Sequence, residues 1–336
     1  MAAPASPLSR STKSRNVAAP VSALTLEEIR NAHRRIAGHV HRTPVLTSRR
    51  LDELCGARLF FKCENLQKTG SFKARGALNA VMSLDEAGIR AGVVTHSSGN
   101  HAAAVSWAAG RRGAAATVVM PRTTNAFKQA AVQRYGGRIV FCEPNHKARE
   151  ETAERIRAET GAEFIHPFND LRVMAGQGTA ALELLGDVPG LEAVVCPCGG
   201  GGLLSSTAIV AQTLDPAIRV MAGEPAGAAD TIQSLAAGHR ESVAHPASIA
   251  DGLLALVGDL TFPEIQRRVE RVAPVSEAEI IGAMRQILEV MKIAVEPSGC
   301  VGYAAVAGGR LGLQGRRVGI ILSGGNVDLD AAVWKA

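Results

Sequence analysis

A lysine near the start of a predicted helix is the first candidate for chemistry in this sequence. Residues 58–64 are predicted to form a strand, and Ser71 is the expected N-cap of a helix that begins at Phe72. Lys73 would then lie in the first helical turn, where unpaired N–H groups disfavour a cation. Arg75 and the apolar residues nearby would lower the pKa of Lys73 further. A lysine with a lowered pKa can act as a Schiff-base nucleophile, although an ordinary surface lysine is the commoner occupant of such a position.

Four consecutive glycines offer a second candidate site. Residues 199–202 follow an apolar segment, 193–198, and precede a predicted helix over residues 203–214. Glycines let the backbone approach an anion closely, and their N–H groups can hold a phosphate together with the helix N-terminus. No Lys-Ser/Thr pair follows, and no GxGxxG motif with an acid about 20 residues later is present, which disfavours nucleoside triphosphates and dinucleotides. A tight structural turn is the alternative, but four glycines would add an entropic cost that such a turn does not need.

Two more polar segments follow predicted strands. Residues 97–101, Ser-Ser-Gly-Asn-His, come after a strand predicted over residues 92–96 and open a helix. Their hydroxyl, amide and N–H groups suit a carboxylate, although a histidine such as His101, taken alone, is more often structural. Ser323 directly follows the last predicted strand, residues 318–322. Because open α/β sheets bind ligands at the carboxyl ends of their strands, Ser323 is expected to point into a cleft.

The elements that position these segments follow a repeating pattern. Short apolar runs alternate with helical periods, which indicates an α/β fold with parallel sheets flanked by helices. Besides residues 58–64, the predicted strands are residues 92–96, 116–120, 138–143, 163–166, 193–198, 219–223, 271–275 and 318–322. A capping box, Thr25 to Glu28, opens a helix that is predicted to end near Gly38.

The strands over residues 92–166 form one compact unit that interrupts the rest of the chain. We therefore predict a small domain, 83–168, inserted into a large domain made of residues 23–82 and 169–336, with a cleft between the two. Residues 1–22 are rich in Ala, Ser, Pro and basic residues and are predicted to be a disordered tail. An organelle transit peptide is the alternative for this tail, because it contains no acidic residue.

Composition limits the classes of function. The chain has 336 residues, of which 46% are apolar and 20% charged, so it can bury a large core. No apolar run reaches the ~18 residues of a membrane span. The net charge of +6 comes partly from the tail, and the 4% of aromatic residues do not interleave with basic ones, which disfavours nucleic-acid binding. The six cysteines form no CxxC pair and are expected to be reduced core thiols of a cytoplasmic protein.

Taken together, the four motifs resemble the fold-type II pyridoxal-phosphate enzymes, specifically the serine racemase and serine/threonine dehydratase group. The resemblance spans about residues 43–328, with the motifs in the family's order. It implies a tryptophan synthase β-like fold, with Lys73 as the aldimine lysine in Ser-Phe-Lys-x-Arg-Gly-Ala. The residues that it implies for cofactor binding are Phe72, Lys73, Asn100, Gly199, Gly200, Gly201, Gly202 and Ser323.

The same resemblance implies a substrate site and a cation site. The implied substrate residues are Ser97, Ser98, Asn100, His101 and Arg149. The segment Gly-Glu-Pro-Ala-Gly-Ala-Ala-Asp is similar to the family's divalent-cation site, in which Glu224, Asp230 and the carbonyl of Ala228 would bind Mg²⁺ or Ca²⁺. Two carboxylates, a carbonyl and waters suit a hard cation. Without the resemblance, these two acids would be interpreted as solvated loop residues.

The resemblance implies a pyridoxal-phosphate-dependent dehydratase. A serine at the ring nitrogen, Ser323, cannot keep that nitrogen protonated as an aspartate would, so the ring is a poorer electron sink and loss of a β-hydroxyl is favoured. We therefore expect an ammonia-lyase that converts serine- or threonine-type β-hydroxy amino acids to a 2-oxo acid and ammonia. Ser98 matches the acid/base that racemases place on the opposite face of Cα, which leaves serine racemase activity open. Phe168 is dehydratase-like, and Ala255 replaces a serine that contacts substrate in the mammalian racemase pattern.

Several alternatives stay open at the level of the sequence. The protein could be primarily a serine racemase or a threo-3-hydroxyaspartate dehydratase. Two alternatives belong to other classes. One is a β-replacement synthase, which normally lacks the Glu224 and Asp230 pair. The other is a non-catalytic pyridoxal-phosphate-binding protein, which the intact Lys73 disfavours. In each case we expect a small-molecule amino acid as ligand, a cytoplasmic homodimer, and no nucleic-acid or membrane partner.

Overall fold

Two separate β-sheets form the framework of the molecule. The computed structural model describes residues 24–330. The larger sheet has six strands in the order β1 (Val45–Leu46), β2 (Arg58–Cys63), β10 (Arg317–Leu322), β7 (Ala193–Pro197), β8 (Arg219–Pro225) and β9 (Arg271–Val275). The smaller sheet has four strands in the order β5 (Arg138–Cys142), β4 (Ala116–Pro121), β3 (Val93–His96) and β6 (Glu163–Phe164). All neighbouring strands are parallel except β1 and β2.

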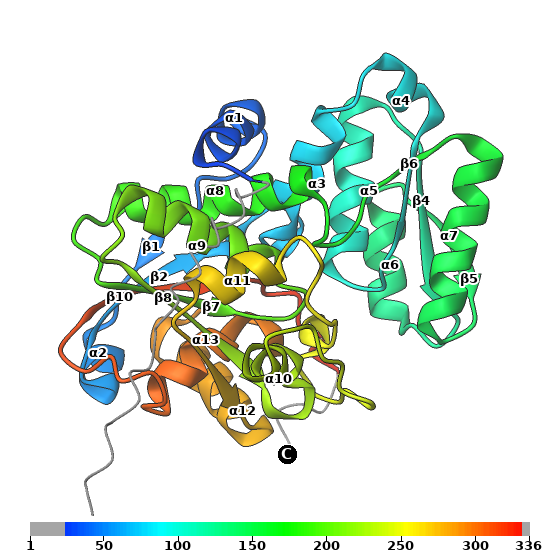
Figure 1. Ribbon diagram of the computed structural model, residues 1–336. Coiled ribbons are helices and arrows are strands. Elements are labelled where there is room, and N and C mark those ends of the chain that lie inside the picture. Colours follow the sequence, from blue (N-terminus) through cyan, green and yellow to red (C-terminus); the bar gives the residue numbers. More distant parts are fainter. Residues whose placement is uncertain (1–23, 331–336) are drawn as a thin grey trace, which may run out of the picture.

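Helices connect most of the strands and cover both faces of each sheet (Figure 1). In chain order they are α1 (Leu26–Ile36), α2 (Arg49–Cys55), α3 (Lys73–Met82), α4 (Glu86–Ala91), α5 (Asn100–Arg112), α6 (Ala126–Arg134), α7 (His146–Thr160), α8 (Leu171–Asp187), α9 (Gly202–Leu214), α10 (Asp230–Ala237), α11 (Phe262–Arg268), α12 (Glu277–Gln286) and α13 (Pro297–Ala307). Parallel strands require such crossovers. Within residues 24–330, the helices are all too short or too polar to cross a lipid bilayer.

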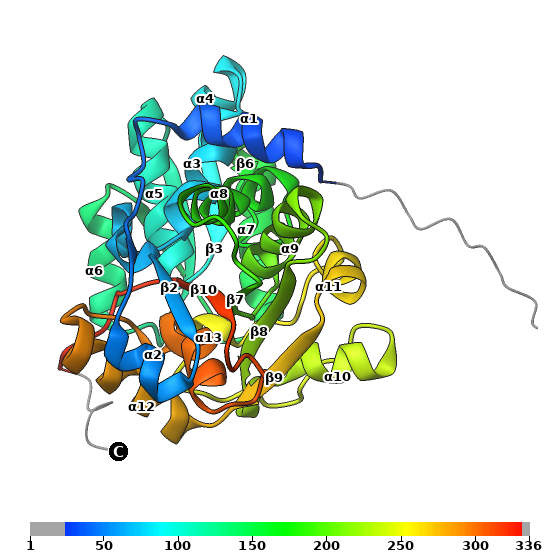
Figure 2. The same ribbon diagram turned by 90° about the vertical axis from the view of Figure 1, so that its left-hand side faces the viewer.

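The hydrophobic core lies on both faces of the larger sheet. One cluster joins this sheet to α2, α12 and α13, and a second joins its other face to α1, α8, α9 and α11. Strands that are covered on both faces have few polar positions, and all five residues of β7 are buried. The smaller sheet packs against α5 and α6 on one face and against α7 on the other. Figure 2 shows α1 lying across α3 and α8.

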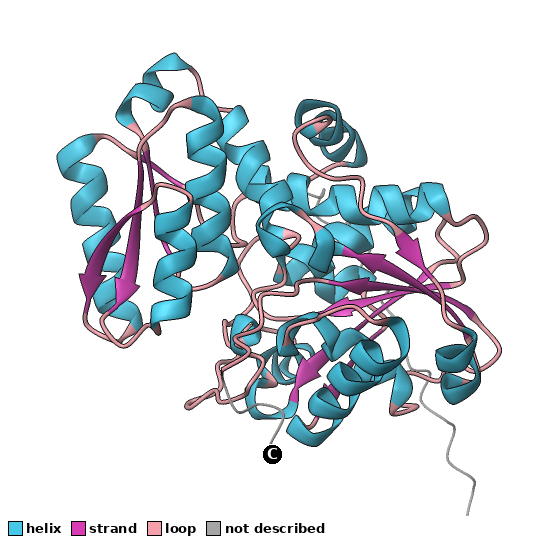
Figure 3. Cartoon of the chain, turned by 180° about the vertical axis from the view of Figure 1, so that it is seen from behind, coloured by secondary structure: helices cyan, strands magenta, loops and turns pink. Residues whose placement is uncertain are grey.

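The division between the sheets follows the chain. Strands β3 to β6 pair only with one another within the described residues, whereas strands before and after them form the larger sheet. Figure 3 shows the two groups of strands, drawn in magenta, as separate bodies. The domain limits predicted at residues 82/83 and 168/169 stay a prediction, because strand pairing does not define them. The predicted tail, residues 1–22, lies outside the described residues.

Most of the predicted elements are present. The capping box of α1 is confirmed, since Thr25 Oγ1 accepts from Glu28 N at 3.2 Å and Glu28 Oε2 accepts from Thr25 N at 2.7 Å. Strand β6 ends at Phe164, two residues earlier than predicted, and Pro167, which has no N–H to continue a ladder, opens a bend over residues 167–169. Strand β1 was not predicted, because a strand of two residues carries no periodic signal.

The predicted cap of α3 was wrong. The helix begins at Lys73, one residue later than expected, and Phe72 occupies the N-cap position without a side-chain cap bond. The buried hydroxyl of Ser71 has no hydrogen-bond partner within the described residues. Ser71 instead forms an isolated bridge with Gly324, so its backbone joins the segment after β10. Sequence preference for a serine cap was overridden by this tertiary pairing.

Candidate active site

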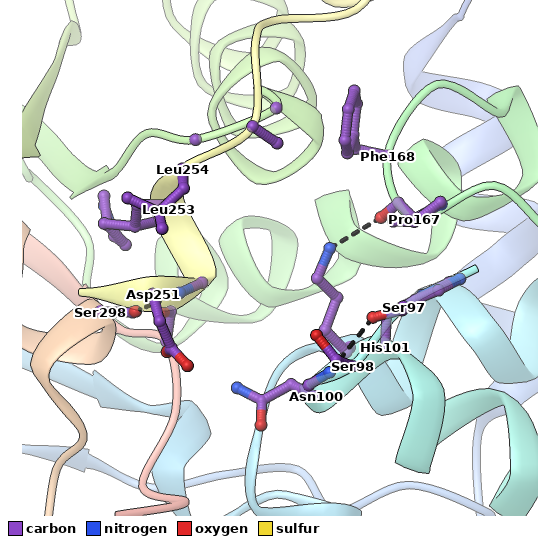
Figure 4. Close-up of a pocket in the computed structure, with 18 of the residues that line it drawn as sticks. Ser97, Ser98, Asn100, His101, Pro167, Phe168, Asp251, Leu253, Leu254 and Ser298 are labelled. Atoms are coloured by element: carbon purple, nitrogen blue, oxygen red, sulfur yellow. Dashed lines mark hydrogen bonds between the residues drawn. The ribbon is translucent and has the colours of Figure 1, made fainter. Parts of the chain in front are cut away.

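A cavity of about 910 Å³ lies between the two sheets. It is lined at the carboxyl ends of β3, β7 and β10, the position at which open α/β sheets bind ligands. Figure 4 shows Ser97, Ser98 and Asn100 facing Asp251, Leu253 and Leu254 across this space. Every residue that the sequence suggested for cofactor or substrate binding lines the cavity: Phe72, Lys73, Ser97, Ser98, Asn100, His101, Arg149, Gly199, Gly200, Gly201, Gly202 and Ser323.

Lys73 extends into the cavity from the first turn of α3. Its Nζ donates to the carbonyl oxygen of Pro167 at 2.7 Å, the bond drawn to Pro167 in Figure 4, and lies 5.1 Å from the centre of the Phe72 ring. The side chain lines the cavity and is partly buried, and this burial lowers the pKa of Lys73 to about 8. An amine with this pKa is largely neutral in weakly alkaline solution and can act as a nucleophile or a base.

Arg75 does not contribute to this lowering, contrary to the prediction. Arg75 is also on α3, but its guanidinium is fully buried. Its Nε donates to Glu64 Oε2 and its Nη1 to Glu183 Oε1, both at 2.8 Å. Lys62, also buried, donates to Glu183 Oε2 at 2.6 Å. The two cations are therefore matched by two carboxylates, and burial alone explains the pKa of Lys73.

The loop between β3 and α5 presents its polar groups to the cavity. Asn100, the first residue of α5, donates to Glu296 Oε1 at 2.6 Å and accepts from Asn326 Nδ2 at 2.9 Å. His101 Nε2 lies 3.1 Å from the carbonyl oxygen of Ile165, while its buried Nδ1 has no partner in the part of the chain that is described. Burial lowers the pKa of His101 well below its usual range, and the nearby charge of Lys73 adds to this effect, so the imidazole is neutral.

The glycine loop leaves its backbone donors available. The N–H groups of Gly199, Gly200, Gly201 and Gly202 have no acceptor within residues 24–330. A Cβ on Gly200 would lie 2.3 Å from Cδ1 of Phe168, and Gly201 has φ +84°. The loop is thus closely packed on its outer side and has four free donors at the N-terminus of α9 (Gly202–Leu214). Such a set of donors fits the phosphate of pyridoxal phosphate.

Two further predicted residues complete the lining. Ser323 lies at the end of β10, and its carbonyl accepts from the backbone N–H of Phe72 at 3.0 Å, which ties it to the lysine segment. Arg149, on α7, has a buried Nε with no partner inside residues 24–330. The Arg149 guanidinium therefore lines the cavity with an Nε–H group that has no acceptor among the described residues.

The structure brings Glu224 and Asp230 together behind the glycine loop. Glu224 accepts from the N–H groups of Thr231 and Ile232 at 3.0 and 3.1 Å, and Asp230 accepts from Val257 N at 3.1 Å. Burial raises the pKa of Glu224 to about 7 and that of Asp230 to about 6, and the charge of Asp230 adds to the shift of Glu224.

The two carboxylates differ in their position relative to the large cavity. Asp230 lines the large cavity, whereas Glu224 and Ala228 do not. No cationic side chain pairs with either acid within residues 24–330. Across the same residues, no group of three His, Cys, Asp or Glu side chains could hold a metal ion. A cation here would thus depend on these two acids, a backbone carbonyl and water.

Several cavity residues were missed by sequence reasoning. Glu296, the N-cap of α13, is buried, and burial raises its pKa to about 7 despite the lowering effects of Asn100 and Lys128. Lys128 on α6 forms an ion pair with Asp251, which joins the two sides of the cavity. Residue pairs so far apart in the chain leave no local pattern. An acid directly before Pro297, at a helix start, is the one local signal that could have drawn attention to Glu296.

Comparison with known proteins identifies the class that this fold and site define. The family model described as pyridoxal-phosphate dependent enzyme matches residues 36–324, so the chain belongs to this family. This confirms the expected fold class and the expected dependence on pyridoxal phosphate.

Particular relatives narrow the comparison. A β-hydroxyaspartate dehydratase of Paracoccus denitrificans (strain Pd 1222) is 49% identical over 311 residues, covering 93% of this chain and 99% of the relative. Serine racemase of Arabidopsis thaliana is 48% identical over 313 residues, covering 92% and 94%. Among solved structures, maize serine racemase has a TM-score of 0.90 at 45% identity, covering 93% of this chain and 96% of that one. A threonine deaminase from T.th. has a TM-score of 0.87 at 42% identity, with 91% and 99% covered.

Proposed function

We propose that this protein is a pyridoxal-phosphate-dependent ammonia-lyase that removes the β-hydroxyl and amino groups of a β-hydroxy amino acid to give a 2-oxo acid and ammonia. The observation that carries the proposal is that Lys73, with a pKa of about 8, shares one cavity with the free donors of the glycine loop. Support also comes from the relatives, whose names include β-hydroxyaspartate dehydratase, threonine deaminase and serine racemase.

Different residues of the cavity would have different roles in this reaction. Bound pyridoxal phosphate would supply an electron sink that acidifies the Cα–H bond of the amino acid. The N–H groups of Gly199–Gly202 would bind the phosphate, and Ser323 would hydrogen-bond the ring nitrogen. Ser97 and Asn100 would hold the α-carboxylate, whereas the neutral ring of His101 donates from Nε2 to the carbonyl oxygen of Ile165 and presents Nδ1 only as an acceptor. The amine of Lys73, neutral above about pH 8, would remove the Cα proton.

Racemisation at the same site requires a second proton carrier. Ser98 lines the cavity beside Ser97 on the loop that opens α5. Its hydroxyl would donate or accept the proton on the face of Cα opposite Lys73. We therefore propose serine racemase activity as a second outcome of the same cavity, carried by Ser98.

A substrate with a second carboxylate is favoured by one feature. Arg149 faces the cavity with a buried Nε that lacks a partner within residues 24–330. A carboxylate on Cβ, as in 3-hydroxyaspartate, would satisfy this guanidinium, whereas serine and threonine would not. This supports threo-3-hydroxyaspartate as a substrate beside serine and threonine.

We further propose that Mg²⁺ or Ca²⁺ binds between Glu224, Asp230 and the carbonyl of Ala228. The support is that both acids are buried, have raised pKa values and lack a cationic partner in the described chain. The cation would have a structural role, since the proposed chemistry needs no Lewis acid.

We also propose that the protein is a homodimer in the cytoplasm. The resemblance to its family supports the dimer, and six buried, free cysteines are consistent with a reducing compartment.

One assay tests the proposal and its alternatives together. The purified protein is incubated separately with L-serine, D-serine, L-threonine and threo-3-hydroxyaspartate, and the oxo acid and the enantiomer of the remaining amino acid are measured. We expect oxo acid to form from at least one of these β-hydroxy amino acids without any added thiol. Product that forms only when a thiol is added would identify a β-replacement synthase, and absorbance from bound cofactor without turnover would identify a binding protein.

A further inference from the structure

The segment that carries Pro167 has an internal anchor. The Nδ1 atom of His166 accepts two backbone N–H groups, from Phe168 at 3.2 Å and from Asn169 at 2.8 Å. Two donors that point at one ring nitrogen require that this nitrogen carry no proton. The ring itself is packed edge-on against Phe168, with 4.7 Å between ring centres and 89° between the planes, so its orientation is fixed.

The anchored peptide is the one that contacts Lys73. The N–H of Phe168 and the C=O of Pro167 belong to a single peptide unit, and within residues 24–330 every peptide is trans. In a planar trans peptide the N–H and the C=O point in opposite directions. Because His166 fixes the N–H, it also fixes the carbonyl, whose oxygen lies 2.7 Å from Lys73 Nζ. Figure 4 shows this carbonyl directed at the amine.

We propose that His166 is a positioning residue for Lys73. By holding the 167–168 peptide, it keeps the Pro167 carbonyl aimed at the lysine amine whenever that amine is not attached to the cofactor. The inference rests on the proposed function, because it assigns Lys73 as the reactive amine. Nothing in it depends on which amino acid is the substrate.

The arrangement suits a nucleophile. A lysine side chain has many rotamers, and an acceptor at a fixed position removes most of that freedom before reaction. A carbonyl binds one N–H of the amine and leaves the nitrogen lone pair free to attack. Misplacement of a reacting group by about 1 Å can lower a rate by 10²-fold, so loss of the acceptor should be measurable.

Three variants separate the anchor from simple packing. His166→Asn keeps an acceptor, because the side-chain oxygen of asparagine can occupy the position of Nδ1. His166→Phe keeps the ring but removes the acceptor. His166→Gln places its amide near the position of Nε2 and leaves the Nδ1 position without an acceptor; it replaces the phenylalanine variant if that one does not fold.

Two measurements on the full chain freed of cofactor provide the test. The first is the rate at which pyridoxal 5'-phosphate attaches to Lys73, fixed by borohydride and located by mass spectrometry. In this reaction the amine nitrogen bonds to the aldehyde carbon and water leaves. The second is the affinity for 4'-deoxypyridoxine 5'-phosphate, which has the ring and phosphate but no aldehyde. We expect His166→Phe to slow attachment by roughly tenfold to 10²-fold. The affinity for the analogue should change less than about twofold, and His166→Asn should restore the attachment rate.

Two outcomes would overturn the inference. If His166→Asn is as slow as His166→Phe, the acceptor is not what matters. If analogue affinity falls as much as attachment, His166 acts on the glycine loop through Phe168, whose ring packs against Gly200. Failure of the proposed function would look different, because wild-type protein would attach the cofactor with the predicted variant pattern yet release no oxo acid from any β-hydroxy amino acid.

Discussion

Lys73 combines a cavity position with a pKa lowered by burial to about 8. We expect Lys73→Ala to bind pyridoxal phosphate weakly, because the covalent attachment is lost. Loss of the base alone should lower turnover by about 10²–10⁴-fold. Borohydride reduction followed by peptide mapping measures the attachment. Lys147→Ala, at a highly exposed position, is the control and should behave like the parent. A reducible adduct that persists in Lys73→Ala would place the attachment elsewhere.

Ser98 allows the two proposed activities to be separated. The hydroxyl is unnecessary for elimination from an L-amino acid, in which Lys73 takes the proton, but it is required on the opposite face of Cα. Ser98→Ala should therefore abolish conversion of L-serine to D-serine and keep much of the oxo-acid formation from L-serine. Chiral chromatography and an oxo-acid assay on one sample give both rates. Equal loss of the two activities would contradict this division of roles.

The sequence predicted the lining of the cavity better than the contacts behind it. Lys73, the glycine loop and residues 97–101 stand in short motifs at predicted strand or helix ends, so their positions followed from local patterns. Arg75 also stands in a motif, yet its partners Glu64 and Glu183 reach it only after three elements pack. The same holds for Glu296 and Asn100, whose contact no local pattern could predict.

At the scale of the element, the turn between β7 and α9 tolerates little extra volume. A Cβ at Gly200 would lie 2.3 Å from the Phe168 ring, so Gly200→Ala should cost about 1–3 kcal/mol of unfolding free energy through overpacking and should weaken cofactor binding. Denaturant unfolding and cofactor titration measure the two effects. Gly186→Ala, in α8 with no atom within 4 Å of its Cβ, is the control and should be neutral or slightly stabilising. If truncating Phe168 in Gly200→Ala does not restore stability, overpacking is the wrong cause.

The segment from β8 to α10 should respond to pH and to metal together. The pKa values of Glu224 and Asp230 are raised to about 7 and about 6, so the folded protein binds more protons than the unfolded chain. Their stabilising contribution is present below about pH 4 and is lost as pH rises through 6 to 7. A bound cation would compensate the charges and prevent this loss.

We therefore expect chelation to lower both activity and Tm at pH 7.5 and to have little effect on Tm at pH 5, with Mg²⁺ or Ca²⁺ restoring the losses. Glu224→Ala should mimic chelation and no longer respond to added metal. Glu296 also has a raised pKa and makes stability depend on pH by itself. The Tm of metal-loaded protein is therefore compared with the Tm of metal-free protein at each pH. If Tm and rate do not change after exhaustive chelation, with metal loss verified by elemental analysis, the cation site is absent.

Elements were predictable where each carries its own signal. The capping box of α1 and the apolar run of β7 depend on residues adjacent in the chain, and both appear as expected. The start of α3 and the two-residue strand β1 depend on pairing with distant segments, and both were missed. Predictions failed where tertiary pairing replaced a local preference.

At the scale of the whole molecule, β10 has a central place in the larger sheet. It pairs with β2 on one side, where Arg317 faces Arg58, and with β7 on the other. During synthesis, β2 and β7 leave the ribosome long before β10, so the sheet lacks this inner strand until residues 317–322 have been made. The smaller sheet is built from one continuous stretch and meets no such delay. Because long-range pairing is slow, the two sheets should become structured at different times.

In pulsed hydrogen exchange during refolding, amides of β3 to β5 should gain protection before those of β2 and β7, and simultaneous protection would contradict this order. A chain interrupted before β10 would expose two apolar strand edges, which makes it prone to aggregate. Ser323, which would contact the cofactor ring, directly follows β10. The cofactor can therefore find a finished site only after β10 is in place, so its binding would report that the larger sheet has closed.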